Sequence, residues 1–271
     1  MTGEDDRPRP LSAFRDEVAI VVSSCDAFFD CWRPFASFFR RYWSDCPFPV
    51  YLITNDLRVR SAVLRSLPVG VDRGWASNMQ SALLQLCESR VLYFQEDYFL
   101  EGAVRHEQLA DDFAHAFEHD VDAFCFRARS ELEPGFQPIN DRFGIVPRDS
   151  DGRTRCQVTL WKRESLLHAL RAGENAWEME SQGSERTRDM RVVSYHQRAQ
   201  QPLPYLMSAI VRGLWTHAAL GFCQENEVAI ASLRGTYTDN SLLRKIRRAQ
   251  TRRRITRELI RLRGTPLDLD S

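Results

Sequence analysis

Two adjacent carboxylates, Glu96 and Asp97, directly follow the apolar and aromatic run at residues 90–94. Such a run predicts a buried strand. Carboxylates are rarely buried unless they are paired or bind a metal, so acids at the end of a core strand suit a divalent cation that holds a phosphate. On this segment alone, a second interpretation stays open, in which the acids only cap the turn after the strand.

Polar residues also follow two earlier predicted strands. Asp26 comes after the apolar segment 18–24, and Asn55 and Asp56 come after the segment 49–54. Strand and helix alternate about four times in the first half, which predicts an α/β fold with a mostly parallel sheet and helices on both faces. Right-handed crossovers would bring these residues to one edge of the sheet, where open α/β sheets bind ligands. Asp26 as a simple helix N-cap is the alternative.

Two local patterns predict how the chain turns near these strands. Ser77 and Gln80 have the spacing of a capping box for a helix that leads to Leu86. Further along, the segments 143–147 and 155–160 flank an Asp-Ser-Asp-Gly sequence, which predicts a β-hairpin.

The 271 residues carry no net charge, but the two signs are unevenly distributed. Residues 240–271 contain ten Lys or Arg and three acids, so this segment carries +7 and the remainder carries −7. We predict a disordered leader at residues 1–16, a catalytic domain at 17–239 and a basic helical tail at 240–271. Seven scattered cysteines without a Cys-x-x-Cys pair indicate buried free thiols in a cytoplasmic protein.

The basic tail has two open interpretations. It is either a solvated helix or a peripheral contact with an anionic membrane through residues 241–263, because aliphatic residues lie among its arginines. Nucleic acid is not an expected partner, since the body is acidic and the tail has no aromatic residue for base stacking beyond Tyr237 just before it. No apolar run approaches the roughly 18 residues of a membrane span, and the first ten residues do not form a secretory signal.

Neither a dinucleotide fingerprint nor a P-loop occurs in the chain, so a phosphate has to be held in another way. Several segments together resemble the GT-A nucleotide-sugar glycosyltransferases, especially bacterial enzymes of polysaccharide or lipopolysaccharide assembly. The resemblance covers about residues 17–230. Its matching pieces are Val21–Asp26, Pro49–Asn55, Gly74–Ser77 with the helix that follows, Glu96–Phe99, Gln157–Trp161 and Trp177–Glu180.

The resemblance implies a GT-A-like fold and a donor site. Asp97 would be the ligand of Mn²⁺ or Mg²⁺ on the donor diphosphate, although Gln95-Glu96-Asp97 departs from the usual Asp-x-Asp spacing. Glu96 would contact ribose or sugar hydroxyls, and Asp26 would contact the nucleotide base. The other donor-binding residues that the resemblance implies are Ser23, Asn55, Asp56, Trp75 and Asn78.

The resemblance also implies transfer of a sugar from the nucleotide sugar to a glycan or lipid-linked acceptor. An inverting enzyme needs a carboxylate to deprotonate the acceptor hydroxyl; Glu180 is the first candidate and Glu178 the second. Trp177 would stack on the acceptor sugar, whereas the alternative makes Trp177 a core residue and leaves both acids in solvent.

Two other functions remain as alternatives. A nucleotidyltransferase that makes nucleotide sugars usually has a Gly-rich loop and a lysine after its first strand, and neither follows Val22. A non-enzymatic nucleotide- or glycan-binding module would not place Glu180 toward the cleft that holds Asp97. The sequence leaves open the donor, the acceptor, the stereochemical course, the metal dependence and the oligomeric state.

Overall fold

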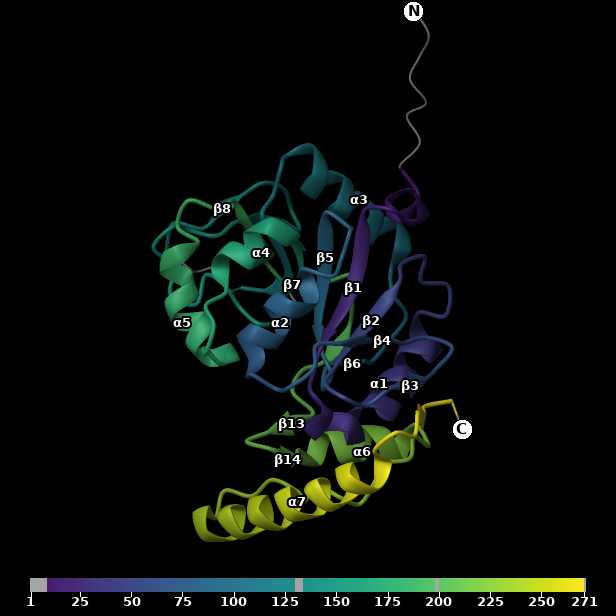
Figure 1. The fold of residues 1–271 in the computed structure, drawn as a ribbon. Coiled ribbons are helices and arrows are strands. Elements are labelled where there is room, and N and C mark those ends of the chain that lie inside the picture. Colours follow the sequence, from purple (N-terminus) through teal and green to yellow (C-terminus); the bar gives the residue numbers. More distant parts are fainter. Residues whose placement is uncertain (1–8, 130–133, 198–199, 271) are drawn as a thin grey trace, which may run out of the picture.

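A nine-stranded mixed sheet forms the centre of the computed structural model, which describes residues 9–129, 134–197 and 200–270 (Figure 1). Its strands, in spatial order, are β4 (Arg65–Pro68), β2 (Val50–Thr54), β1 (Val18–Ser23), β5 (Arg90–Gln95), β10 (Thr159–Lys162), β7 (Ala123–Ala128), β11 (Val192–Tyr195), β9 (Phe143–Ile145) and β8 (Gln137–Pro138).

Most of these strands point in the same direction. β4, β2, β1 and β5 pair in parallel, as do β7 and β11. β10 is antiparallel to both of its neighbours, β5 and β7, and β9 is antiparallel to β11. The predicted α/β class with a mostly parallel sheet is therefore confirmed.

Helices cover both faces of the sheet because the side chains of each strand alternate between two cores. Ile20 and Val22 of β1 pack in the core beneath α1 (Phe29–Tyr42) and α3 (His106–Glu118). Val21 packs in the opposite core. That core lies beneath α2 (Trp75–Leu83), α4 (Arg163–Ala169) and α5 (Ala176–Arg186), as Figure 1 shows.

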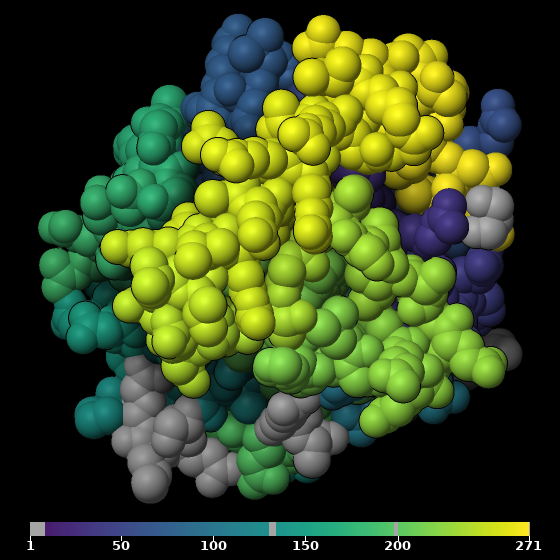
Figure 2. Space-filling view, turned by 90° about the horizontal axis from the view of Figure 1, so that it is seen from below, coloured from purple at the N-terminus to yellow at the C-terminus, as the bar shows by residue number. Residues whose placement is uncertain are grey.

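Short strands and two further helices lie below the carboxyl ends of β1, β2 and β5 (Figure 1). They are the pair β6 (Phe99–Leu100) with β12 (Tyr205–Leu206), the hairpin of β13 (Ile210–Val211) and β14 (Leu214–Trp215), α6 (His217–Glu225) and the long helix α7 (Ser241–Leu262). After α7, β15 (Leu267–Asp268) pairs with β3 (Val59–Arg60). Figure 2 shows α7 lying along the underside of the molecule. None of the described helices combines the length and the apolar character that a membrane crossing requires.

The structure corrects three local predictions. Part of the predicted disordered leader is ordered: Leu11–Phe14 forms a 3-10 turn, and the Phe14 ring packs against Phe113 and Phe117 with centroids 5.8 and 5.1 Å away. Residues 1–8 lie outside the described residues. The predicted capping box is wrong, because α2 already begins at Trp75, after Gly74.

The predicted hairpin at residues 143–160 is also wrong. β9 pairs with β8 and β11, while β10 inserts between β5 and β7 instead of folding back on β9. The Asp-Ser-Asp-Gly sequence is a turn between two strands that do not pair with each other. The Asp-Ser-Asp-Gly residues do form a turn, but pairing with distant strands decides the positions of β9 and β10 in the sheet.

Candidate functional site

Asp26 joins the ends of β1 and β2. It lies at the start of a 3-10 turn, η2 (Asp26–Phe28), and its carboxylate accepts the backbone N–H groups of Asn55, Asp56 and Leu57 at 2.8, 2.8 and 2.9 Å. In return, Asn55 Oδ1 accepts the Asp26 N–H at 3.0 Å. The two strand ends therefore meet, as the alternation of elements predicts. The Asp26 carboxylate binds across to the β2 loop instead of capping the helix that follows it.

Glu96 and Asp97 lie at the end of β5 and are largely buried, with 9% and 6% of their surface exposed. Asp97 Oδ2 accepts the backbone N–H of Ile210, at 3.0 Å, and the Asp97 carbonyl accepts that of Ala209, at 2.9 Å. Asp97 Oδ1 is buried, and no hydrogen-bond partner for it occurs among the described residues. The start of β13 thus covers one side of this acid pair.

Burial makes both carboxylates hard to ionise. It raises the pKa of Asp97 to about 6, and it raises the pKa of Glu96 well above its usual value, with a further contribution from the Asp97 charge. The Arg234 guanidinium favours the charged forms of both acids. However, Arg234 already donates to both carboxylate oxygens of Asp30, at 2.7 and 3.0 Å. The negative charge of Glu96 and Asp97 is therefore only partly neutralised.

A bound divalent cation would neutralise this remaining negative charge. Mg²⁺ is usually bound through one or two carboxylates together with substrate phosphates and water. Within the described part of the chain, no three His, Cys, Asp or Glu side chains converge as a complete ligand set. A cation at the buried, unpaired Asp97 Oδ1, with Glu96 beside it, would therefore draw its remaining ligands from a phosphate-bearing substrate and from water.

The loop before α2 lies beside the end of β2, where Asn55 Nδ2 donates to the Gly70 carbonyl at 2.9 Å. Asp72 Oδ1 accepts the Gly74 N–H at 2.9 Å and the Asn78 side-chain amide at 2.8 Å, while Asn78 Oδ1 accepts the Arg73 N–H at 3.1 Å. Gly74 has φ +89°, a conformation that favours glycine. Asn78 is 4% exposed, so the structure uses its side chain to hold this loop.

Cys25 links that loop to the acid pair. Its pKa is raised to about 12, first by burial and then by the charges of Glu96 and Asp72. The carboxylates of Glu96 and Asp72 therefore both lie near the Cys25 thiol at the end of β1. Ser23, at the same strand end, is buried, and its carbonyl accepts the Glu96 N–H at 3.2 Å. Asp72 was not predicted from the sequence, because no apolar strand directly precedes it.

Trp75 at the start of α2 packs edge-on against Tyr93 of β5, with ring centroids 6.5 Å apart. Its side chain is only partly buried. Asp56 is exposed beyond the end of β2. These two residues, unlike Asn55 and Asn78, keep part of their surface open at the edge of the sheet.

Glu180 of α5 is connected to the end of β5 through one residue. Its Oε1 accepts the Cys156 N–H at 2.7 Å, and the Cys156 carbonyl accepts from Tyr98 Oη at 3.0 Å and from Gln95 Nε2 at 2.7 Å. Gln95 and Tyr98 flank the acid pair in the sequence. The structure therefore brings Glu180 to the side of the site where Asp97 lies.

Glu178 and Trp177 have different environments. Glu178 Oε2 accepts the Asn175 N–H at 2.8 Å, and Asn175 Oδ1 accepts the N–H groups of Trp177 and Glu178, both at 3.0 Å. Glu178 thus completes a capping box at the start of α5. Trp177 is 73% exposed, so the alternative that makes it a core residue is wrong.

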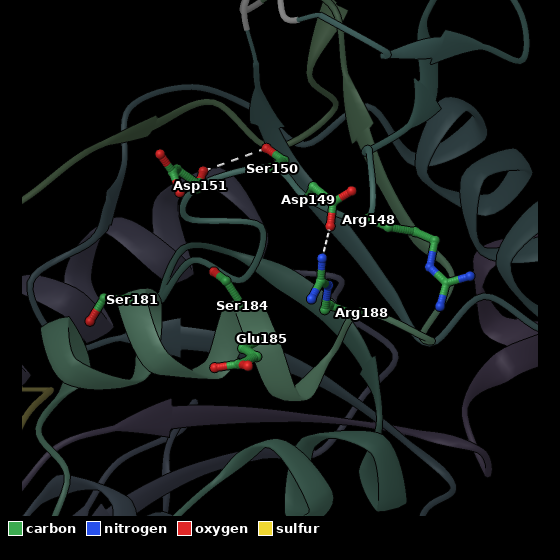
Figure 3. A pocket seen from close by; sticks show the side chains of 8 residues that line it. All are labelled: Arg148, Asp149, Ser150, Asp151, Ser181, Ser184, Glu185 and Arg188. Carbon is green, nitrogen blue, oxygen red and sulfur yellow. Dashed lines mark hydrogen bonds and ion pairs between the residues drawn. The ribbon is translucent and has the colours of Figure 1, made fainter.

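A hollow of about 260 Å³ lies against α5 (Figure 3). Residues 148–151 form one wall, and Ser181, Ser184, Glu185 and Arg188 form the other. Arg188 forms an ion pair with Asp149 across it. Because Trp177, Ser181 and Ser184 recur at helical spacing, the exposed tryptophan and the hollow share one face of α5, and Arg188 lines the hollow just beyond the end of the helix. The sequence patterns did not indicate this hollow, whose wall is the turn between β9 and β10.

Comparisons with known proteins give a likeness to solved structures only. No family model matches the chain, and no curated protein matches it. S. aureus TarS 1–349 is 12% identical over 70% of this chain and 59% of that chain, with a TM-score of 0.47. The mannosyltransferase PcManGT from Pyrobaculum calidifontis, in complex with GDP-Man and Mn²⁺, is 13% identical over 78% of this chain and 62% of that chain, with a TM-score of 0.45.

The glycosyltransferase GlyE of Streptococcus pneumoniae is also similar, at 12% identity over 93% of this chain and 65% of that chain, with a TM-score of 0.40. This chain thus spans less than two thirds of the length of each of these three proteins.

Proposed function

We propose that this protein is a glycosyltransferase that moves a sugar from a nucleoside diphosphate donor to a glycan or lipid-linked acceptor. The observation that carries the proposal is the grouping at one sheet edge of a buried acid pair, Glu96 and Asp97, with a third carboxylate, Glu180, approaching from α5. The pair is suited to the donor diphosphate and its cation, and Glu180 is suited to the acceptor hydroxyl.

The donor would lie over the ends of β1, β2 and β5. Asp26, Asn55 and Asn78 shape this surface through backbone hydrogen bonds, so their contribution to the donor site is to hold its loops. Ser23 lies at the buried base, while Asp56 and Trp75 keep exposed surface for the nucleoside. When bound, Mn²⁺ or Mg²⁺ would neutralise charge that develops on the leaving diphosphate.

Glu180 would act as the general base of an inverting reaction. Its carboxylate is held by the Cys156 N–H, which fixes the side chain without giving it a neutralising cation. Trp177 offers an exposed aromatic face for the acceptor sugar, one helical turn from Ser181. Glu178 is occupied by the cap of α5, which favours Glu180 for this role.

The two alternatives are less well supported. β1 is followed by Ser24-Cys25-Asp26, which offers neither the glycine loop nor the lysine of a nucleotidyltransferase. A binding module has no reason to bring Glu180 beside the loop of the acid pair, yet both meet at Cys156.

Product analysis distinguishes these functions. The protein would be incubated with Mn²⁺, a panel of nucleoside diphosphate sugars and a glycan or isoprenoid phosphate acceptor, and separately with nucleoside triphosphates and sugar 1-phosphates. A glycosyltransferase releases nucleoside diphosphate from the first set. Release of pyrophosphate from the second set would instead identify a nucleotidyltransferase, and donor binding without either product would identify a binding module.

We also propose peripheral contact with an anionic membrane through residues 241–263. Leu242 and Ile260 of α7 are 66% and 62% exposed. Arg253 and Arg257 are exposed on the same outward side. An amphipathic basic surface of this kind adsorbs to anionic lipid headgroups.

A further inference from the structure

A groove of about 530 Å³ separates α7 from η2 and the β13–β14 turn. α7, which runs along the underside of the molecule in Figures 1 and 2, forms one long wall, and Ala27, Phe28 and Gly213 lie opposite it. The groove is lined by Ala27, Phe28, Gly213, Arg234, Lys245, Arg248, Ala249, Thr251, Arg252, Ile255, Thr256 and Leu259.

The α7 wall is strongly basic. Lys245, Arg248 and Arg252 follow one another at i, i+3 and i+7, so they lie on one face of the helix. Within residues 9–129, 134–197 and 200–270, no carboxylate forms an ion pair with any of the three. Three like charges along one groove repel each other, and a phosphate between them would relieve that repulsion.

The base of the groove is apolar. Ile255 is 5% exposed, and Leu259 is half-buried beside it. Arg234 also lines the groove, but its charge is neutralised by Asp30 and its guanidinium lies over the Phe28 ring, 4.8 Å from the centroid. That face of Phe28 is therefore not available for stacking on a nucleotide base. The groove combines free cations on one wall with an apolar base.

We propose that this groove binds a phosphate or diphosphate ester of a long apolar chain. The phosphate lies between Lys245, Arg248 and Arg252, and the first part of the chain lies along Phe28, Ile255 and Leu259. The charge complements the phosphate, and the apolar base removes hydrocarbon from water.

The position of the groove connects this ligand with the candidate site. Ala27 and Phe28 directly follow Asp26, and Gly213 belongs to the hairpin whose first strand donates the Ile210 N–H to Asp97. The ligand would accordingly be the lipid-linked acceptor, an assignment that rests on the proposed function. Binding itself does not rest on it, because a phospholipid headgroup carries the same chemistry.

Calorimetry with farnesyl phosphate, a soluble isoprenoid phosphate, tests the proposal. Farnesol and inorganic phosphate each carry half of the chemistry and should bind at least tenfold more weakly, which corresponds to about 1.4 kcal/mol. The double variant Arg248→Gln/Arg252→Gln should also lose at least tenfold. Its matched control, Arg253→Gln/Arg257→Gln, removes the same charge from the outward side and should bind as the parent does.

A second variant tests the shape of the groove without changing its charge. Ala249 lines the groove and is exposed, so Ala249→Trp should fill the space, keep the fold and weaken farnesyl phosphate binding. Equal loss in both double variants would reduce the effect to general surface charge and overturn the proposal. Tighter binding of inorganic phosphate or a nucleoside diphosphate than of farnesyl phosphate would overturn it as well.

Two further measurements distinguish a lipid-linked acceptor from a membrane lipid, and failure of the groove proposal from failure of the proposed function. In the first, short-chain phosphatidic acid competes with farnesyl phosphate, and the groove variants are assayed for sugar transfer to an isoprenoid phosphate. If phosphatidic acid competes and the variants transfer sugar normally, the groove binds a membrane lipid and is not the acceptor site. Failure of the parent protein to bind any nucleoside diphosphate sugar would remove the proposed function while leaving farnesyl phosphate binding intact.

Discussion

Asp97 is a buried carboxylate whose charge the described structure compensates poorly. Its Oδ1 has no partner there, and burial raises its pKa to about 6. In an unfolded chain the pKa is near 3.9, so the folded state binds the proton more tightly. The resulting contribution to stability is fully present below about pH 4 and is lost as the pH rises through 6.

Asp97→Asn removes this titration. We expect the variant to be more stable than the parent at pH 8 without added metal, by up to about 3 kcal/mol, and to show no such gain near pH 4. Urea unfolding at the two pH values measures the difference. A gain that is equal at both pH values would mean that Asp97 is not held in a costly ionised state.

Glu180 and Glu178 offer a matched pair of substitutions on one helix. Glu180→Gln should keep donor binding and reduce transfer by about 10²–10⁴-fold, because the amide hydrogen-bonds but does not accept the acceptor proton. Glu178→Gln should keep transfer and lower the free energy of unfolding by about 1 kcal/mol or less, since it only weakens a cap. An active Glu180→Gln enzyme would move the base elsewhere or indicate retaining chemistry.

Among the elements, the segment before α7 is attached to α1 by one buried ion pair. Arg234 and Asp30 are 9% and 4% exposed, and Arg234 also donates to the carbonyls of Ala27 and Gly213. Arg234→Met should cost about 3–5 kcal/mol, because it leaves Asp30 buried without a partner. The double variant Arg234→Met/Asp30→Leu should recover much of that loss in thermal unfolding. If the double variant is as unstable as the single one, the uncompensated Asp30 charge is not the cause.

The ends of β1, β2 and β5 could be predicted from the sequence, while the distant residues that contact these strand ends could not. An apolar run followed by an acid identifies the ends of β1, β2 and β5, since each signal is local. Arg234, by contrast, acts on residues some 200 positions away, and nothing in its neighbours indicates this. The contact between Cys156 and Glu180 likewise depends on β10, which enters the sheet between β5 and β7. The local turn pattern instead predicts that this strand pairs with the preceding one as a hairpin, and that prediction is wrong.

The basic tail is an integral part of the molecule as a whole. Ile255 and Leu269 are buried, Thr251 accepts the Gly235 N–H at 3.0 Å, and β15 extends the chain as a partner of β3. The segment forms one helix from Ser241 to Leu262, and its inward face consists of single residues spaced along a charged sequence. Periodicity is weak in such a segment, so the docking of α7 under the sheet edge was not predicted.

The outward side of α7 provides a prediction about membranes. Sedimentation with anionic phospholipid vesicles should carry the protein down at low salt, and Arg253→Gln/Arg257→Gln should weaken this binding, by about 1 kcal/mol for each charge removed. Neutral vesicles serve as the control, because the attraction is electrostatic and falls with ionic strength. Equal binding to both kinds of vesicle would contradict the proposed contact.

The central claim is that the acid pair at the end of β5 belongs to a nucleotide-sugar site. Its most direct test is the thermal unfolding of the parent and of Asp97→Asn with a panel of nucleoside diphosphate sugars and Mn²⁺. At about 100 times its dissociation constant, the correct donor stabilises the parent by about 2.7 kcal/mol, or about 5 °C in Tm. We predict this shift for at least one donor in the parent, and its loss in the variant. If no nucleotide sugar shifts the Tm of the parent, or if the variant responds just as the parent does, the acid pair does not belong to a nucleotide-sugar site.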